Sequence, residues 1–342
     1  MPSYRGKRVD TIIVFLTFVS LNVSYTLATR DTSTSSLAEE AMKARHAMWM
    51  VEYGRTYKDE AEKAHRFKVF KANINFIERS NKVTGNGKYL LETNEFADMS
   101  NEEFMAMYAR SESMPSTAKK TSSFKYMNVT LINIPKEVDW NKKGAVTKIK
   151  DQKSCACCWA FSVVGAVEGI HQITTGQLLS LSEQQLLDCS SDKSDCNTGF
   201  KGLAFEYIIK NGGIATEDAY PYTAKKGVCR SVKPAVKITN FEVVPEDNED
   251  ALAKVVAHQP VAVSIDATKF QFYGGGVMQG KDCGTNLTHG MTLVGYGLTQ
   301  DGTKYWLLKN QWGEKWGEKG YMRLERGTGA CGVAKSAFYP VA

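Results

Sequence analysis

The sequence predicts an α+β protein in two parts, a helical N-terminal third followed by a larger domain that carries every cysteine. Residues 38–81 are rich in strong helix formers, and their apolar side chains recur at three- and four-residue spacing. A second helical pattern begins at Cys158, and strand-like apolar runs begin at His289 and Lys304. Since all eight cysteines lie at or after Cys155, the first 150 residues are a different kind of structure from the rest.

Residues 1–28 have the pattern of a secretory signal peptide. Basic residues between positions 5 and 8 precede an apolar stretch from Thr11 to Leu21, and small residues near Ala28 form a cleavage signal. At about ten residues the stretch is too short to span a bilayer, and no later stretch reaches about 18 apolar residues, so we expect no membrane anchor. A buried N-terminal strand is the alternative.

The composition is that of a folded globular protein. Of 342 residues, 43% are hydrophobic and 23% are charged. The net charge is +6, but acidic and basic residues are mixed along the chain. Because the chain has no long basic run with interleaved aromatic residues, we do not expect it to bind nucleic acid.

The helical third divides at Gly54 into two helices, and the second is expected from about Asp59 to Ser80. One apolar stripe runs along it, formed by Phe67, Phe70, Ile74 and Ile77. Residues 111–123 are rich in Ser, Thr, Lys and Pro without periodicity. They predict a flexible connector that a protease can cut readily.

Cys158 is the candidate nucleophile. The segment from Asp151 to Phe161 reads DQKSCACCWAF, and the helical spacing of the apolar residues after it places the start of a helix near Cys158. A cysteine at a helix N-terminus faces unpaired backbone N–H groups and the positive end of the helix dipole. Both favour the thiolate, which is the nucleophilic form.

The cysteine count favours three disulfides and two free thiols in a secreted protein. Cys157 and Cys158 are neighbours, so their Cα atoms lie about 3.8 Å apart. Disulfides normally need about 4.4 Å or more, and leaving both thiols free avoids that strain. The six other cysteines allow 15 pairings, and the count does not choose among them.

A thiolate nucleophile needs a base and a group that orients the base. Of the five histidines, His289 alone opens a strand-like apolar run, and Asn310 follows the strand expected over Lys304–Leu308. Two neighbouring strands could bring the Asn310 amide oxygen to an imidazole N–H and fix the tautomer. The alternative is that all three residues are ordinary structural residues.

The run Cys155-Ala156-Cys157-Cys158-Trp159 resembles the active-site signature of the papain family of cysteine proteases, and the resemblance spans residues 38–342. His289 follows Cys158 by 131 residues and Asn310 follows it by 152. The resemblance implies that Cys158 is the nucleophile, His289 the base and then the acid, and Asn310 the orienting residue. It also implies roles for two more residues: an oxyanion-hole amide at Gln152, working with the Cys158 N–H, and a shielding indole at Trp312.

The implied fold is α+β and papain-like, with a helical left lobe, a β-barrel-like right lobe and the site between them. The resemblance implies neither a cofactor nor a metal. It pairs the six other cysteines as Cys155–Cys196, Cys189–Cys229 and Cys283–Cys331.

The helical third resembles the inhibitory propeptides of cathepsin L-type enzymes. The first propeptide motif is matched by Glu62, Arg66, Val69, Phe70, Asn73, Ile77 and Asn81, and the second by Asn94, Phe96 and Asp98. This implies a signal peptide over 1–28, an inhibitory propeptide over 29–133 that runs backwards through the cleft, and a peptidase domain over 134–342. Activation cleavage is expected between about residues 127 and 134.

The resemblance also implies the substrate-binding positions. The Gly199 backbone is expected to hydrogen-bond the substrate. The main selectivity pocket, which takes the residue before the scissile one, corresponds to Phe200, Lys201, Ser264, Leu287, Gly290 and Ser336. We expect it to prefer Leu, Val or Phe. Lys201 is unusual there, and at the rim of the pocket it could admit an acidic side chain.

Several positions depart from the family pattern. Ala156 and Thr198 stand where the family has glycine, Cys157 and Gln311 where it has serine, and Glu92 where the second propeptide motif has glycine. If Ala156 needs a positive φ, the oxyanion hole could shift. The alternative function is therefore a catalytically impaired homologue that binds peptides or inhibitors. A metal or redox module built on Cys155–Cys158 lacks a second paired ligand cluster.

The expected protein is a secreted or vacuolar cysteine endopeptidase made as an autoinhibited zymogen, which hydrolyses peptide bonds through a thiolate–imidazole pair and an acyl-enzyme. Its resemblance is to plant vacuolar or secreted enzymes, including those of senescence. Expected partners are protein and peptide substrates, cystatin-type inhibitors and its own propeptide, and we expect a monomer. Glycosylation sequons stand at Asn128 and Asn286. The expected location is the secretory pathway, ending in a vacuole, a lysosome-like compartment or the extracellular space.

Overall fold

The structure is a computed structural model that describes residues 36–83, 88–109 and 124–342. The expected signal peptide, 1–28, and the expected connector, 111–123, lie outside the described residues. The chain divides into two units, Met1–Ala72 and Asn73–Ala342, which are described separately.

The first unit contains a helix over residues 36–52 and the beginning of α2, Glu60–Val83. Gly54 has a φ of +60°, which lies in the left-handed region that glycine adopts without strain, and it follows the end of the first helix. Aromatic rings join the two helices: the ring of Phe70 lies 4.9 Å from His46 and 5.3 Å from Trp49. The prediction of two helices that divide at Gly54 is confirmed.

The second unit holds the rest of α2 and all the remaining elements. In chain order its helices are α3 Asn101–Tyr108, α4 Cys158–Thr175, α5 Glu183–Cys189, α6 Lys201–Lys210 and α7 Glu249–Val256, with short 3₁₀ turns η1 Leu131–Asn133, η2 Gly280–Asp282 and η3 Ala330–Gly332. Its strands are β1 Tyr89–Leu91, β2 Val138–Asp139, β3 Asn240–Val243, β4 Val261–Ile265, β5 Tyr273–Met278, β6 His289–Leu298, β7 Lys304–Lys309, β8 Tyr321–Glu325 and β9 Ala337–Val341.

The strands form one sheet with the order β1-β5-β8-β7-β6-β4-β9-β3, and β2 pairs with β6. All pairs are antiparallel except β5 with β8. β6 is buried from His289 to Gly297, which explains why its sequence is a continuous apolar run without alternation. The strands predicted at His289 and at Lys304 are confirmed.

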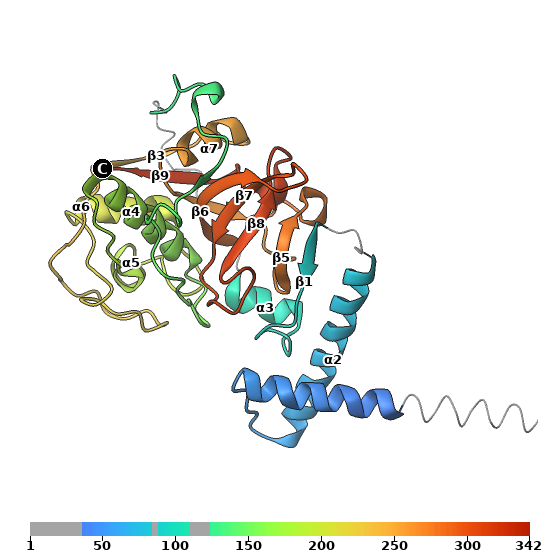
Figure 1. The fold of residues 1–342 in the computed structure, drawn as a ribbon. Helices are drawn as coiled ribbons and strands as arrows, with labels where there is room; N and C mark the ends of the chain where they lie inside the picture. Colours follow the sequence, from blue (N-terminus) through green and yellow to red (C-terminus); the bar gives the residue numbers. More distant parts are fainter. Residues whose placement is uncertain (1–35, 84–87, 110–123) are drawn as a thin grey trace, which may run out of the picture. The chain divides into compact units, whose positions relative to one another are not determined.

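Helices and sheet each contribute one core. Helices α4, α5 and α6 lie together beside the sheet (Figure 1), and buried residues such as Trp159, Val163 and Phe205 form their core. The second core fills the sheet, where Trp306 and Leu308 are fully buried. This division into a helical lobe and a sheet lobe positions the N-terminus of α4 against the start of β6.

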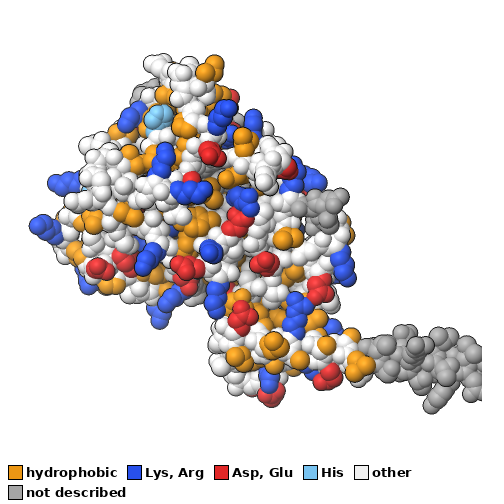
Figure 2. Space-filling view, in the orientation of Figure 1, with side chains coloured by type: hydrophobic (Ala, Val, Ile, Leu, Met, Phe, Trp, Pro, Cys, Tyr) orange, Lys and Arg blue, Asp and Glu red, His pale blue; other side chains and the backbone are white. Residues whose placement is uncertain are grey.

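Charges of both signs are interspersed over the visible face of the second unit (Figure 2), as the mixed charge pattern of the sequence predicts. Within the described residues, no helix combines the length and the apolar character that crossing a membrane requires.

Candidate active site

Cys158 is the first residue of α4, as the sequence predicts. Cys157 precedes it in the N-cap position without a side-chain capping hydrogen bond, so the helix start is not satisfied by a local side chain. The backbone N–H groups of the first turn and the helix dipole therefore act at the Cys158 sulfur, where they stabilise a negative charge. In the precursor the side chain is only 2% exposed.

His289 and Asn310 are brought together by the pairing of β6 with β7. His289 is the first residue of β6, and Asn310 directly follows β7. His289 Nε2 lies 2.8 Å from Asn310 Oδ1, so the amide oxygen accepts the ring N–H and fixes the tautomer. The fully buried Trp312 ring lies 4.5 Å from the imidazole, next to this hydrogen bond.

The start of α4 lies directly against the start of β6. A Cβ atom added to Gly290 would lie 2.9 Å from the backbone oxygen of Cys158, so only glycine permits this approach. The backbones at the first residues of α4 and β6 therefore lie close together. Because Nε2 carries the hydrogen that Asn310 accepts, Nδ1 is the unprotonated nitrogen of the neutral ring.

Gln152 is fully buried at the same place. Its backbone N–H donates to the Gln311 carbonyl at 2.9 Å, and an isolated bridge joins Asp151 to Trp312. Its side-chain Nε2 lies 3.1 Å from the Cys155 carbonyl oxygen and 3.3 Å from the Tyr108 carbonyl oxygen. Tyr108 ends α3, in the segment that precedes the peptidase domain. The amide expected to stabilise an oxyanion thus donates to a carbonyl oxygen of the expected propeptide.

The six other cysteines form three disulfides, Cys155–Cys196, Cys189–Cys229 and Cys283–Cys331, which are the pairs that the resemblance implies. Among the described residues, Cys157 and Cys158 are the cysteines that form no disulfide.

The two free thiols differ in their surroundings. Burial raises the pKa of the Cys157 thiol far above its ordinary range. The Cys157 Sγ lies 3.0 Å from the Tyr222 hydroxyl, which donates in turn to the Gln152 carbonyl at 2.8 Å. Cys157 is therefore a protonated, structural thiol at neutral pH.

The residues expected to bind substrate gather beside α4. Gly199 lies flat against the Trp159 ring, where an added Cβ would come within 2.0 Å of the indole. Gly290 pairs with Ser264 across β6 and β4. The Leu287 side chain lies close to Gly332. Phe200 occupies the N-cap position of α6 without a side-chain hydrogen bond.

Lys201 differs from the expectation that it stands at the pocket rim. In the precursor it is buried, with 1% of its surface exposed, and its ammonium donates to the Ser264 hydroxyl. Ser264 Oγ lies 3.5 Å from Ser336 Oγ, so the three polar residues of the expected pocket form one contact chain. The buried ammonium is hydrogen-bonded there, because the Ser264 hydroxyl accepts from it.

The departure at Ala156 does not strain the backbone. Ala156 does not have a positive φ. In this segment the non-glycine residue with a positive φ is Lys153. The Thr198 N–H donates to Asp195 Oδ1 at 2.8 Å, so this residue belongs to a hydrogen-bonded turn. Neither substitution removes a group from the site.

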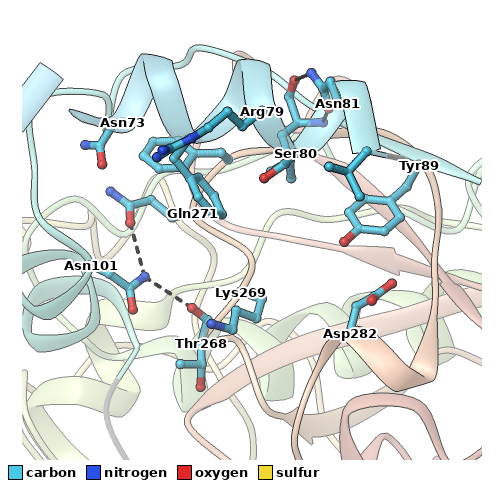
Figure 3. A pocket seen from close by; sticks show the side chains of 14 residues that line it. Asn73, Arg79, Ser80, Asn81, Tyr89, Asn101, Thr268, Lys269, Gln271 and Asp282 are labelled. Carbon is cyan, nitrogen blue, oxygen red and sulfur yellow. Dashed lines mark hydrogen bonds between the residues drawn. The ribbon is translucent and has the colours of Figure 1, made fainter. Parts of the chain in front are cut away.

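The expected propeptide contacts the peptidase domain through an aromatic cluster and a set of amides. Phe104 lies 5.0 Å from Trp312 and 5.1 Å from Phe96, measured between ring centroids. Asn94 donates to the Gln271 carbonyl at 2.7 Å. Asn101 donates to the Thr268 carbonyl and to the Gln271 side-chain oxygen, both at 3.1 Å (Figure 3).

A cavity of about 600 Å³ is lined by residues of α2, β1 and the loop before β5. Figure 3 shows the side chains that line it. It contains none of the expected catalytic residues. Both α2 and β1 belong to the expected propeptide, so this cavity is expected to be lost when that segment is removed.

A buried charge cluster lies behind the site. Lys150 donates to Glu183 Oε1 at 2.8 Å and to Glu168 Oε1 at 3.2 Å. Lys309 donates to Thr147, which donates to Glu168 Oε2 at 2.6 Å. Lys150 lies two residues before Gln152, and Lys309 precedes Asn310 directly, so the cluster anchors both segments that carry the site. Among the described residues, no group of three or more His, Cys, Asp or Glu side chains is arranged to hold a metal ion.

Burial opposes ionisation throughout the charge cluster, and the outcome differs from residue to residue. For Glu168, Lys150 and Lys309 outweigh burial and lower the pKa. For Glu183, burial together with the neighbouring Glu168 raises the pKa to about 8 in spite of Lys150. Three carboxyl groups, those of Glu168, Glu183 and Glu217, act on the two lysines, Lys150 and Lys309. If one of the three carboxyl groups keeps its proton, two negative charges balance two positive charges.

The sequence did not predict α3, the contacts of the Gln311 side chain or the charge cluster. A signal for α3 was present: Ser100 and Glu103 form a reciprocal capping box, a pattern that is visible in the sequence. The charge cluster joins residues that are far apart in the chain, and no local pattern marks it.

Comparisons with known proteins identify the family of the chain. Residues 134–341 match the family model described as papain family cysteine protease, and residues 46–104 match the cathepsin propeptide inhibitor domain. A senescence-specific cysteine protease, SAG39 of Oryza sativa subsp. japonica, is 51% identical over 328 residues, which are 93% of this chain and 95% of the relative. Vignain of Ricinus communis is 45% identical over 344 residues, or 95% and 94% of the two chains.

Solved structures of precursors are similar over most of the chain. The recombinant stem bromelain precursor has a TM-score of 0.82 at 42% identity, covering 88% of this chain and 99% of that one. The proform of the ragweed pollen allergen Amb a 11, a cysteine protease, has a TM-score of 0.83 at 43% identity, covering 89% and 95%. The chain belongs to the papain family, and it is a papain-like cysteine endopeptidase made as a propeptide-inhibited zymogen.

Proposed function

We propose that Cys158, His289 and Asn310 carry out the peptide-bond hydrolysis. The thiolate attacks the carbonyl carbon and forms a C–S bond, the imidazolium protonates the departing amine, and water then attacks the acyl-enzyme with the imidazole as base. Gln152 Nε2 and the Cys158 N–H stabilise the negative oxygen. The observation that carries the proposal is the 2.8 Å His289–Asn310 hydrogen bond, beside the helix that begins at Cys158.

A Cys158→Ala variant tests the catalytic assignment. The purified precursor is acidified, its size is followed, and a Phe-Arg or Leu-Arg reporter is assayed, with active sites counted by an irreversible epoxide that reacts only with a competent thiolate. Cys158→Ala abolishes self-conversion, reporter cleavage and epoxide labelling. Cys157→Ser is the matched control and keeps all three, because the Cys157 thiol is buried and protonated. If Cys157→Ser lost labelling and Cys158→Ala kept it, the assignment would be wrong.

We propose that the chain comprises a signal peptide over 1–28, a propeptide over 29–133 and a peptidase domain over 134–342. Ile132 is 94% exposed, whereas Tyr126 before it and Val138 after it are buried. An exposed segment between two buried anchors is a favourable place for proteolysis, so activation cleavage falls between about residues 127 and 134. N-terminal sequencing of the matured enzyme locates the cut.

For the main selectivity pocket we propose a preference for Leu, Val or Phe. Phe200 and Leu287 supply apolar surface, and Ser336 carries no negative charge that could hold a basic side chain. The Lys201 ammonium, in contact with Ser264, repels Arg and Lys and attracts a carboxylate. Cleavage of a peptide library ranks these side chains, and a preference for Arg would contradict this proposal.

We propose that the protein enters the secretory pathway and acts in a vacuole, a lysosome-like compartment or the extracellular space. The signal-peptide pattern over 1–28 supports this, as do the three disulfides, which persist in oxidising compartments. Asn128 and Asn286 are exposed sequon asparagines and are proposed glycosylation sites. Loss of mass after glycosidase treatment, localised to each peptide, tests them. The proposed partners are protein and peptide substrates and cystatin-type inhibitors, and the proposed state is a monomer.

A further inference from the structure

Gln311, where the family has serine, contacts both halves of the proposed site. Its side chain is 3% exposed, between Asn310 and Trp312. Its amide nitrogen, Nε2, lies 2.8 Å from the Gly290 carbonyl oxygen, 3.2 Å from Gln152 Oε1 and 3.1 Å from His289 Nε2. One side-chain amide therefore connects the strand that carries the imidazole with the residue proposed for the oxyanion hole.

The number of hydrogens decides which of these contacts are hydrogen bonds. An amide nitrogen carries two hydrogens, and the two oxygens, on Gly290 and Gln152, accept both. The hydrogen on His289 Nε2 goes to Asn310 Oδ1, so that nitrogen does not accept one from Gln311. The approach of Gln311 to His289 is therefore a packing contact between two donors.

The backbone fixes the orientation of the Gln311 amide. If this amide were reversed, its Oε1 would lie about 2.8 Å from the Gly290 carbonyl oxygen, and two acceptors would face each other. The Gly290 carbonyl belongs to β6, where Gly290 pairs with Ser264, so it does not turn away. The side-chain nitrogen of Gln311 must therefore face Gly290 and Gln152.

Gln311 in turn dictates how the Gln152 amide is turned. Because Gln152 Oε1 accepts from Gln311, Gln152 Nε2 faces the Cys155 carbonyl and the Tyr108 carbonyl. The reversed amide would present an oxygen at the position where negative charge develops. We propose that Gln311 is a positioning residue for catalysis, which locks the Gln152 amide with its donor in the oxyanion hole. This inference rests on the proposed role of Gln152.

A serine could not perform this role in the same way. A hydroxyl has one hydrogen, so it satisfies either Gly290 or Gln152 and not both. It can also accept as well as donate, and so it does not impose one orientation on a neighbouring amide. The Gly290 carbonyl of β6 orients the Gln311 amide, and the second hydrogen of that amide orients the Gln152 amide.

The test uses enzyme matured from the full-length precursor, with active sites counted by the epoxide. The variants are Gln311→Met, which keeps an unbranched side chain without a donor, Gln311→Ser, Gln152→Ala and the double variant Gln311→Met with Gln152→Ala. Gln185→Met is the matched control, since Gln185 is also a buried amide, but its bond to the Ala215 N–H lies away from the site.

Three measurements separate positioning from a structural role. The first is kcat/KM on a peptide reporter, and the second is the affinity for a peptide aldehyde, whose adduct places an oxygen in the oxyanion hole. The third is the rate of reaction with 2,2′-dipyridyl disulfide, which needs the thiolate but forms no oxyanion. We expect Gln311→Met to lower the first two by about 3- to 10-fold, the worth of one hydrogen bond, and to leave the third unchanged. Gln311→Ser lowers them less.

The double variant gives the decisive result. Gln152→Ala lowers kcat/KM by about 100-fold or more, and adding Gln311→Met to it has no further effect. The inference is overturned if Gln311→Met and Gln311→Ser keep full aldehyde affinity, if their disulfide reaction slows in parallel, or if the two losses multiply. It is also overturned if Gln185→Met lowers kcat/KM equally. Full activity of Gln152→Ala would instead refute the proposed oxyanion role itself.

Discussion

Phe104 is the propeptide side chain whose removal should weaken autoinhibition most directly. It is fully buried on α3, and its ring contacts Phe96 at 5.1 Å, Tyr108 at 5.6 Å and Trp312 at 5.0 Å. Replacing a buried Phe by Ala costs about 3–5 kcal/mol. One of these three ring contacts crosses to the peptidase domain, so we assign about a third of that loss to weaker docking. About 1–1.7 kcal/mol corresponds to a factor of about 5 to 20.

The assay is the rate of self-conversion of the full precursor at a fixed acidic pH, followed by size and by reporter cleavage. Phe104→Ala should convert about 5- to 20-fold faster than the unmodified precursor. Met107→Ala is the matched control, because Met107 lies on the same helix with 44% of its surface exposed. The matured enzymes should have equal kcat/KM, since both residues leave with the propeptide. If Phe104→Ala converts no faster than Met107→Ala, the aromatic cluster does not hold the propeptide.

Three further perturbations have expected outcomes. Lys201→Met should raise kcat/KM several-fold for substrates with Leu in the main selectivity pocket and abolish cleavage of substrates with Glu in that pocket, as measured with matched reporters. Glu183 has a pKa raised by burial to about 8 from 4.5, so the folded state retains a proton that the unfolded state releases, and stability falls as pH rises between these values. Glu183→Gln removes this dependence. Between pH 5 and 8, thermal melting should show the stability of the variant rising relative to that of the parent by up to about 1.4 kcal/mol per pH unit. Parallel pH profiles of the two proteins would contradict this prediction. Replacing Cys189 and Cys229 by Ser opens a loop with a sequence separation of 40 and should cost about 4 kcal/mol, measured by denaturant unfolding; an unchanged midpoint would contradict it.

The elements that the sequence predicted are those with local signals at both ends. The start of α4 was predictable because apolar spacing changes to a helical period at Cys158, and α4 ends at Gly176 in the left-handed conformation. β6 and β7 were predictable as apolar runs, and their adjacency places His289 beside Asn310. The disulfide pairs came from the resemblance, since geometry alone left 15 choices open.

The parts that escaped prediction depend on tertiary contacts. The orientation of Lys201 toward Ser264 depends on α6 meeting β4, and nothing in the sequence of either element indicates whether the ammonium turns inward. The charge cluster likewise forms between α4, α5 and β7. Gln311 was visible as a departure from the family, but its contacts required the position of Gly290 and Gln152 in three dimensions.

The precursor inhibits by occupying a finished site, and this has a consequence for activation. The hydrogen bond between His289 and Asn310 is already formed at 2.8 Å, and Gln152 already presents its donor. Gln152 Nε2 donates to the Tyr108 carbonyl oxygen, and the Phe104 ring packs against the Trp312 ring. A carbonyl oxygen in that place occupies the donor that is proposed to receive the substrate oxygen. Activation therefore requires removal of the propeptide, whereas the hydrogen bond between His289 and Asn310 is already in place.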